Sequence, residues 1–437
     1  MQGVPPTGSR SIISGGRSIV VLGASGLTAL ATVVVTVVAA HVLTVEDNAK
    51  FLVYWSLLFG VFQVMSGMQN EATRAVSSLL ETDGQPKARV ILMPLILGCA
   101  SIAVVGLAAG ADRLFLGAGL LTGIAPLVIT VSMIVIVSYS CHLTLVGALA
   151  GRHFWVPMAG LGAVESIIRL TAVLAIGLAV GGLVPLELAA ALPALTWLLL
   201  ALVWRPVRQA VGSRADVGLG RLLRNGSLAM LTAGASAVLV NGFPFVTRLA
   251  VADMVTAGAL ASLLLAIQLT RAPMMIPLMA FQGVVISAFV AQKQYRVKAL
   301  VKPLLAVVGA GVALALLMAA IGPFLMRLLY GPQYVLPPIV LGGMTFAAVS
   351  LALLTLSGAA TLAISAHRAY LAGWWVGAIA TVSLLFLLPL PPVWRVAAAV
   401  FCGPLTGVAV HLVAIARSRD PAVSAEELTP ASIKNEE

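Results

Sequence analysis

Ionisable side chains inside apolar stretches are the residues of this sequence that could do chemistry. Arg271 has no acidic residue within one helical turn, whereas Glu165 and Arg169 stand four residues apart. A charge at the centre of a membrane helix costs roughly 2.5–3.5 kcal/mol on insertion scales, so each of these residues is a functional candidate. Glu165 and Arg169 could form an internal ion pair or bind a ligand, and Glu165 is also the candidate for cation coupling.

A polar stripe in one apolar stretch adds further candidates. Its small and polar residues recur at steps of four and three, which places them on one helical face. They are Ser56, Gly60, Gln63, Gly67, Asn70 and Arg74. Close helix packing explains small and hydroxylated residues, but amide and guanidinium groups need protein, water or a ligand. Arg74 could pair with Glu71, and Arg248 could extend to the membrane surface.

Basic and amide side chains of this kind suit an anionic ligand. A guanidinium group matches the geometry of phosphate, and a basic residue without an acidic neighbour leaves its charge available. The candidates for substrate binding are Gln63, Asn70, Arg74, Arg169, Asn241, Arg248, Gln268 and Arg271.

The sequence lacks the signatures of nucleotide hydrolysis and of metal binding. It contains no G-x-x-x-x-G-K-[ST] phosphate loop, its five histidines are dispersed, and its three cysteines, Cys99, Cys141 and Cys402, are far apart. We therefore expect no catalytic residue, no cofactor and no metal site, and we expect that the chain is not an enzyme.

The composition predicts the elements that position these residues. Of 437 residues 60% are hydrophobic and only 9% are charged, and the mean hydropathy is +1.07. Apolar runs of about 20 residues recur, each long enough to cross a bilayer as a helix. The net charge of +11 does not indicate nucleic acid, because the basic residues lie in short loops between these runs. The sequence predicts an all-α polytopic membrane protein.

Twelve spans are expected. They are 18–40, 51–75, 88–110, 114–140, 156–180, 185–204, 226–250, 254–292, 299–325, 336–365, 369–388 and 394–416. The eighth is too long for one straight crossing and contains Pro273 and Pro277, so we expect a kink there.

The distribution of basic residues predicts orientation and domains. If the N-terminus is cytoplasmic, the inner segments hold 19 of the 26 Lys and Arg residues and the outer turns hold 5. The positive-inside rule then places both termini in the cytoplasm. We expect a cytoplasmic N-terminus at 1–17, a lobe of six helices at 18–204, a basic cytoplasmic linker at 205–225, a second six-helix lobe at 226–416 and a disordered cytoplasmic tail at 417–437.

Four stretches in the same order resemble the Wzx-type polysaccharide flippases of the multidrug/oligosaccharidyl-lipid/polysaccharide exporter superfamily. The first is the turn 43–50 leading to 66–74, with the sequence SGMQNEATR. The second is 147–152 leading to Arg169, the third is Ala257-Gly258 followed by Arg271, and the fourth is the turn 329–334, LYGPQY. The chain departs from that pattern at Ala259, where the family has an aromatic residue, and at Asn241, the residue nearest to the family's acidic position in helix seven.

The resemblance implies a fold of two six-helix lobes around a cavity that opens to alternate faces. It also implies a function: transfer of a polyprenyl-diphosphate-linked glycan from the inner to the outer leaflet of a bacterial plasma membrane, for cell-envelope polysaccharide biosynthesis. The expected partners are the lipid-linked glycan and the bilayer, with glycan-assembly enzymes as further candidates and no nucleic acid. Two alternatives stay open: a cation-coupled multidrug antiporter of the same superfamily, and a membrane scaffold with a degenerate transporter core.

Overall fold

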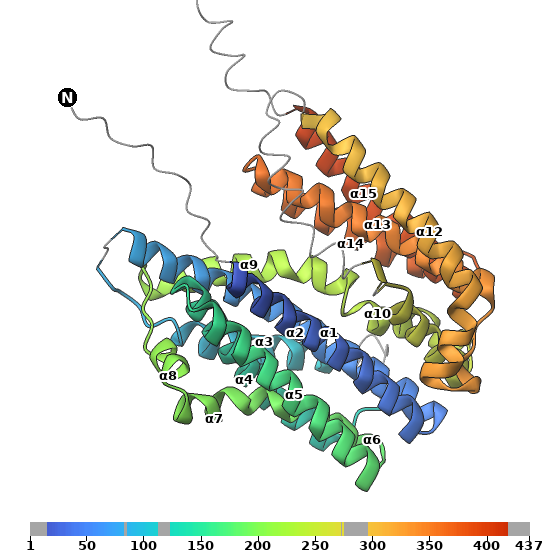
Figure 1. Cartoon of the computed structure of the whole chain (residues 1–437), viewed down its shortest axis with the longest axis horizontal. Coiled ribbons are helices and arrows are strands. Elements are labelled where there is room, and N and C mark those ends of the chain that lie inside the picture. Colours follow the sequence, from blue (N-terminus) through green and yellow to red (C-terminus); the bar gives the residue numbers. More distant parts are fainter. Residues whose placement is uncertain (1–14, 83–84, 112–122, 272, 275–295, 418–437) are drawn as a thin grey trace, which may run out of the picture. The chain divides into compact units, whose positions relative to one another are not determined.

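The computed structural model describes residues 15–82, 85–111, 123–271, 273–274 and 296–417, and these residues are almost entirely helical (Figure 1). The α-helices are α1 (Gly15–Val42), α2 (Val45–Glu81), α3 (Leu92–Ala111), α4 (Pro126–Gly151), α5 (Trp155–Ala179), α6 (Leu183–Ala191), α7 (Thr196–Val203), α8 (Arg205–Val211), α9 (Leu219–Leu239), α10 (Phe243–Val251), α12 (Arg296–Tyr330), α13 (Pro338–Ala363), α14 (His367–Leu387) and α15 (Pro392–Arg417). Short 3-10 helices are η2 (Leu192–Leu195), η3 (Ala252–Met254) and η5 (Pro332–Tyr334). The described part of the chain contains no β-strand, so the all-α prediction is confirmed.

Helices are present at the predicted spans, but the placement of the fourth span was wrong. It was predicted over 114–140, whereas residues 123–125 are not helical and α4 covers Pro126–Gly151, because Pro126 starts that helix. Within the described residues, nine helices are long and apolar enough to cross a membrane, and the bent pair α9 and α10 makes up one further crossing. Two shorter apolar helices, Leu92–Ala108 and Ala257–Arg271, account for the third and eighth predicted spans. The eighth helix is described only to Arg271 and at Pro273 and Met274, whereas Pro277 lies outside the described residues. The kink expected from Pro273 and Pro277 therefore stays a prediction.

One span that the sequence predicts as a continuous helix is broken, and another changes helix type along its length. The sixth span stays helical from Leu183 to Val203, with the 3-10 helix η2 around Pro193 between α6 and α7. The seventh bends by 55° between α9 and α10, where Gly242 precedes α10 and Pro244 lies in its first turn. Proline has no backbone N–H, so it cannot continue the hydrogen bonds of the preceding helix.

The chain divides into two compact units. Of the described residues, unit 1 takes those up to Val42, from Met65 to Ala111 and from Ile124 to Met230, and unit 2 takes the others. The division falls within α2 and α9. The lobe boundary predicted at 205–225 is not tested by this division and stays a prediction.

In unit 1, small residues allow helices to approach one another closely. Helices α1 and α5 lie side by side (Figure 1). A methyl group on Gly151 of α4 would lie 2.7 Å from the carbonyl oxygen of Thr73 in α2. Close approach at small residues is how helices associate in a bilayer, where apolar burial between helices adds little.

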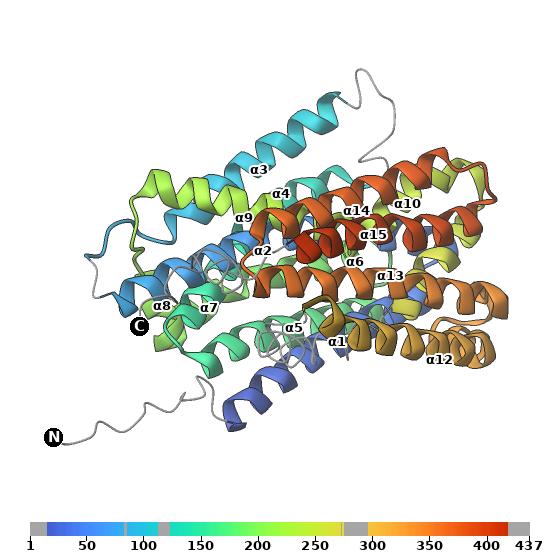
Figure 2. The ribbon, with the colours of Figure 1, turned by 90° about the horizontal axis from the view of Figure 1, so that it is seen from above.

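In unit 2, helices α12, α13, α15 and α14 follow one another, and each packs against the next (Figure 2). Here too a glycine permits the approach, because a methyl group on Gly342 of α13 would lie 3.0 Å from the carbonyl oxygen of Ala315 in α12. The outward side of α12 is strongly apolar: Leu316, Phe324 and Leu328 are 62–68% exposed.

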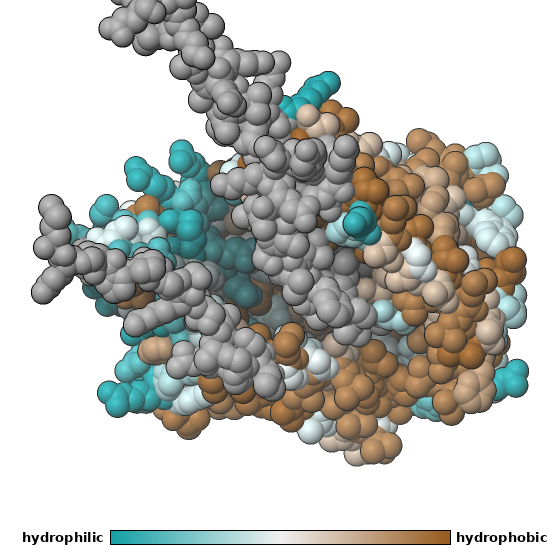
Figure 3. All heavy atoms as spheres, turned by 45° about the horizontal axis from the view of Figure 1, so that its top comes forward, coloured by the Kyte–Doolittle hydropathy of each residue, from teal (hydrophilic) through white to brown (hydrophobic). Residues whose placement is uncertain are grey.

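Hydrophobic side chains cover much of the surface that Figure 3 draws. Large aliphatic side chains are exposed on the helices of both units, including Leu199 and Leu202 on α7 and Leu387 on α14. A soluble protein seldom exposes contiguous apolar areas of this kind, whereas lipid solvates them. The chain is therefore a multi-pass membrane protein.

Candidate functional site

The break between α9 and α10, in unit 2, frees backbone groups that a continuous helix would pair. In an α-helix the carbonyl of residue 240 would accept from the N–H of residue 244, but residue 244 is proline. The carbonyls of Leu239, Val240 and Asn241 instead accept hydrogen bonds from side chains of other helices. Irregular backbone at membrane depth is tolerated only inside protein or along a water-filled cavity, so breaks of this kind are typical of binding sites in transporters.

Ser56 of α2 joins the two sides of the break. Its hydroxyl donates to the carbonyl of Asn241, 2.6 Å away, and its Oγ accepts from the backbone N–H of Phe245, 3.0 Å away. Gly60, one turn later, lies so close that a methyl group on it would be 3.2 Å from Cα of Gly242. The stripe on α2 therefore includes the residues that hold the broken span.

Two predicted site residues meet at the same place. Asn241 Nδ2 donates to Gln63 Oε1 at 3.3 Å, so the amide groups of α2 and of the break contact each other. This contact joins residues 178 positions apart in sequence. Helical spacing placed Gln63 on the same face as Ser56, but only the structure brings that face to the break.

Arg271 binds the carbonyl end of α9. Its Nη1 donates to the carbonyls of Leu239, at 2.9 Å, and Val240, at 3.3 Å, and its guanidinium carbon lies 4.6 Å from the centre of the Phe243 ring. The last carbonyls of a helix carry partial negative charge, and an aromatic face attracts cations. Half-buried Arg271 makes no ion pair with any described residue.

Two further candidates in unit 2 lie nearby in sequence. Gln268 precedes Arg271 by one turn of the same helix and is half-buried. Arg248 lies on α10, beyond the break, and is also half-buried. These positions alone do not test a role in binding, so the roles of both residues remain expectations.

The other candidates lie in unit 1, and they differ in environment. Asn70 is exposed on α2. Arg169 and Glu165 form a buried ion pair on α5, in which Nη2 of Arg169 donates to Oε1 of Glu165 and Nη1 lies 3.3 Å from Oε2. Arg169 Nε also donates to the carbonyl of Ala190 at 3.0 Å. The charge of Arg169 is therefore balanced within the protein, as one of the two interpretations from the sequence expects.

Sequence reasoning missed a further buried carboxylate in this unit, Glu187. Glu187 of α6 is fully buried. His142 on α4 is also buried, and its ring stacks on that of Tyr139 with the ring centroids 5.2 Å apart. An isolated acidic residue at the start of the sixth apolar run was the signal that could have found Glu187. Buried carboxylates carry a large desolvation cost, so this part of unit 1 is the place to examine for cation coupling.

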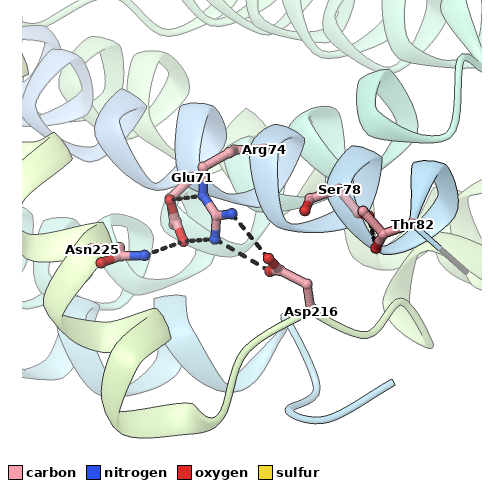
Figure 4. Close-up of polar contacts among 6 residues, drawn as sticks. All are labelled: Glu71, Arg74, Ser78, Thr82, Asp216 and Asn225. Carbon is pink, nitrogen blue, oxygen red and sulfur yellow. Dashed lines mark hydrogen bonds and ion pairs between the residues drawn. The ribbon is translucent and has the colours of Figure 1, made fainter. Parts of the chain in front are cut away.

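Arg74 is the centre of a polar network within unit 1 (Figure 4). It donates to both carboxylate oxygens of Glu71, at 2.7 and 2.8 Å, and to those of Asp216, at 3.1 and 3.3 Å. Asn225 of α9 donates to Glu71 Oε1 at 3.1 Å. The sequence predicted the contact with Glu71, one turn away, but not those with Asp216 and Asn225, which are 142 and 154 residues from their partners.

The loop carboxylate of this network stays ionised. Partial burial alone would raise the pKa of Asp216, but hydrogen bonds and charge from Arg74 outweigh that effect and hold the pKa below its usual range. A lowered pKa stabilises the network at every pH above the ordinary value of an aspartate and loses this contribution only in acid. Arg74 is thus paired throughout the physiological range.

Relatives of this chain occur in mycobacteria. No family model matches the chain. The uncharacterised protein Rv3630 of Mycobacterium tuberculosis (strain H37Rv) is 34% identical over 399 residues, which cover 90% of this chain and 91% of that protein. The uncharacterised protein Rv1510 of the same strain is 33% identical over 408 residues, 92% of each chain. Both matches extend over almost the whole chain.

Solved structures share the fold at low sequence identity. The lipid II flippase MurJ, in an inward closed conformation, is similar with a TM-score of 0.68 at 12% identity, over 92% of this chain and 88% of that one. A multidrug resistance MATE family transporter of the MOP superfamily, in an inward-facing conformation, has a TM-score of 0.65 at 16% identity, over 95% and 100%. A point mutant of the MATE transporter VcmN of Vibrio cholerae has a TM-score of 0.62 at 14% identity, over 94% and 96%.

These likenesses confirm the fold class that the resemblance implies. At such identity they establish the fold alone, whereas the mycobacterial relatives are similar enough to define a family. The chain belongs to the family of the mycobacterial proteins Rv3630 and Rv1510, and it has the all-helical fold of the MATE transporters and of MurJ.

Proposed function

We propose that this protein is a flippase that moves a polyprenyl-diphosphate-linked glycan from the inner to the outer leaflet of the plasma membrane by alternating access, for cell-envelope polysaccharide biosynthesis. Both termini would lie in the cytoplasm. The observation that carries the proposal is Arg271. Among the described residues its guanidinium is held by two carbonyls and an aromatic ring, and by no carboxylate.

An arginine held in this way can exchange partners. The carbonyls at a helix end together carry about half an elementary charge, whereas a diphosphate brings full negative charges and oxygens that match a guanidinium. A diphosphate headgroup near Arg271 would therefore compete well against Leu239 and Val240. Asn241 and Gln63, which already contact each other beside the break, offer amide groups for the neutral parts of a glycan.

The membrane potential supplies a driving force for such a substrate. Each charge gains ~2.3 kcal/mol per 100 mV, so an inside-negative potential of that size would favour outward movement of two negative charges by roughly 4–5 kcal/mol. Transport of an anionic lipid in this direction therefore needs no nucleotide hydrolysis by the same chain.

The decisive experiment is transport of a fluorescent polyprenyl-diphosphate glycan by the purified protein in liposomes. Arg271→Ala should lower the rate about tenfold or more, because a lost charged hydrogen bond is worth roughly one to two powers of ten. Arg271→Lys should keep part of it, because an ammonium group preserves the charge without the bidentate geometry. Arg327→Ala is the matched control, since Arg327 is exposed on α12.

Two results would contradict the proposal. One is equal transport by the Arg271→Ala and Arg327→Ala variants when both are folded, which would remove Arg271 from substrate binding. The other is no transport of the lipid by the native protein. In the native host, depletion should cause lipid-linked glycans to accumulate in the inner leaflet, as measured by leaflet-resolved analysis.

A cation-coupled multidrug antiporter is the second candidate. It is favoured by the likeness to MATE transporters and by buried Glu165, a membrane carboxylate of the kind that cation coupling requires. The two functions differ in a simple measurement: an antiporter would expel cationic drugs from liposomes only when a proton or sodium gradient is present. A scaffold with a degenerate transporter core would move neither cargo.

A further inference from the structure

The linker that follows α8 pairs with the loop between α2 and α3, all within unit 1. Val90 N donates to the carbonyl of Ser213 at 3.0 Å, and Ala215 N donates to the carbonyl of Ala88 at 2.8 Å. These two hydrogen bonds flank an antiparallel bridge between Arg89 and Arg214, which is the only isolated bridge in the described residues. The bridge thus places two arginines directly opposite each other.

The hydrogen-bond pattern of the bridge determines the distance between the Cβ atoms of the two arginines. Because the bonds flank the pair instead of joining it, Arg89 and Arg214 form a non-hydrogen-bonded pair, whose Cβ atoms stand about 4.5–5.5 Å apart on the same side. Both side chains are exposed, whereas Val90, Ser213 and Ala215 beside them are buried. Two guanidinium groups therefore extend from neighbouring points into the surroundings.

Nothing in the described residues balances this pair. Neither arginine makes a hydrogen bond or ion pair through its side chain with any residue that the structure describes. Asp216, two residues after Arg214, already binds Arg74, as does Glu71. Like charges opposite each other destabilise a bridge, so this arrangement is unfavourable unless an anion lies between them.

The positive-inside rule alone does not account for the pair. That rule requires basic residues in the inner loops, and the exposed residues Lys87, Arg221 and Arg224 meet it without facing another basic residue across a bridge. Two arginines on one side of a bridge instead provide several parallel donors for phosphate oxygens.

We propose that Arg89 and Arg214 form a binding site for the phosphate group of an anionic lipid headgroup at the inner surface of the membrane. Loops beside the ends of membrane helices lie at headgroup depth, and the cytoplasmic leaflet of a membrane with anionic lipids attracts basic groups. A bound phosphate would neutralise the pair and fix the linker against the α2–α3 loop, next to the network around Arg74. This site is separate from the break in the seventh span and does not depend on the transported substrate.

Binding can be measured on the purified, delipidated full chain in a neutral detergent. The probes are phosphatidylglycerol, phosphatidylcholine with the same acyl chains, and inorganic phosphate, and the readout is lipid retention in native mass spectrometry together with thermal stability. Phosphatidylglycerol should be retained and should raise the melting temperature more than phosphatidylcholine does. Arg89→Gln or Arg214→Gln should each weaken retention about tenfold, the usual effect of losing a charged hydrogen bond.

Further variants make the test specific. Arg221→Gln is the matched control, because it removes the same charge from an exposed arginine of the same unit outside the bridge, and it should retain phosphatidylglycerol as the native chain does. The double variant Arg89→Lys/Arg214→Lys should bind with intermediate affinity. The double variant Arg89→Gln/Arg214→Gln should lose retention altogether, and if it is not recovered folded, the single glutamine variants decide.

Three outcomes would overturn the proposal. In the first, Arg221→Gln weakens retention as much as the bridge variants do, which would indicate a diffuse basic surface. In the second, the bridge variants retain phosphatidylglycerol as the native chain does. In the third, inorganic phosphate alone reproduces the stabilisation and phosphatidylglycerol adds nothing, which would assign the site to a soluble phosphate compound.

Discussion

Arg169 and Arg271 carry the same charge but have different partners: a carboxylate for Arg169, and backbone carbonyls for Arg271. Arg169 is buried beside Glu165, and each of the two would be costly in the membrane without the other. Arg271 donates hydrogen bonds to two backbone carbonyls, and it forms an ion pair with no carboxylate that the structure describes. Removing Arg169 therefore leaves a buried anion, whereas removing Arg271 leaves two carbonyls at the end of α9. Arg169 therefore contributes to the stability of the protein, whereas Arg271 can exchange its carbonyl partners for a ligand, as the proposed function requires.

A double-mutant cycle tests this contrast at the residue scale. Arg169→Ala should destabilise the protein by about 3–5 kcal/mol, because it leaves Glu165 buried and unpaired. Adding Glu165→Ala should restore part of that stability, so the double variant should be more stable than the sum of the single changes predicts. Thermal unfolding of the four proteins in one detergent measures the coupling.

The same variants bear on cation coupling. If Glu165 serves only the ion pair, Glu165→Gln should change stability but leave the pH dependence of transport as it is. Additive single changes, with no coupling energy, would show that the pair does not stabilise the protein. A lost response to pH in Glu165→Gln would support the antiporter alternative instead.

At the scale of elements, the break in the seventh span depends on what replaces its lost hydrogen bonds. Pro244 deprives the carbonyl of Val240 of its helical partner, and Arg271 takes that place. Ser56 binds both a carbonyl and an N–H across the gap. The 55° bend is therefore fixed by two residues from other helices, and each is a point at which the geometry of the site can be changed.

Ser56 provides the prediction at this scale. Ser56→Ala should destabilise the protein by about 1 kcal/mol, since it leaves Asn241 O and Phe245 N without this partner. It should also lower the apparent affinity for substrate, because the carbonyl ends that hold Arg271 would shift. Ser56→Thr keeps the hydroxyl and should preserve both properties, as measured by thermal unfolding and by concentration-dependent transport.

The matched control removes a hydroxyl that bonds only within its own helix. Ser101 on α3 donates to the carbonyl of Leu97, four residues earlier, so Ser101→Ala should leave substrate affinity unchanged. Equal effects of Ser56→Ala and Ser101→Ala on affinity would mean that the hydrogen bonds of Ser56 across the break do not position the site.

The sequence alone could not predict this element. Residues 226–250 form a continuous apolar run, and proline is tolerated in membrane helices when neighbouring groups satisfy the freed backbone. Whether Pro244 kinks the span or breaks it depends on Ser56 and Arg271, which are far away in sequence. Helical periodicity did place Ser56, Gly60 and Gln63 on one face. That shared face was predictable from the sequence, but its contact with the break between α9 and α10 was not.

At the scale of the whole molecule, hydropathy was sufficient for the architecture. A backbone in hydrocarbon has to satisfy its own hydrogen bonds, so apolar runs of about 20 residues leave little choice except helices. The sequence therefore predicted twelve helical segments, but it placed the fourth too early in the chain and did not predict the break in the seventh. Contacts such as that of Arg74 with Asp216, 142 residues apart, arise from the tertiary fold and leave no local signal.

The orientation of the protein in the membrane is the remaining prediction at this scale, and it rests on the count of 19 basic residues against 5. In a background without Cys99, Cys141 and Cys402, a cysteine at Gln333 should react with a membrane-impermeant maleimide in intact cells, because this exposed residue lies in the turn expected outside. A cysteine at Gly218 should react only after the membrane is opened. Gly218 suits this purpose because it is exposed in the linker and a Cβ there meets no atom within 4 Å. Labelling of Gly218→Cys in intact cells, with Gln333→Cys protected, would show that the orientation is the reverse of the one predicted. The proposed outward movement of substrate and the lipid site at Arg89 and Arg214 would then both have to be assigned to the opposite face.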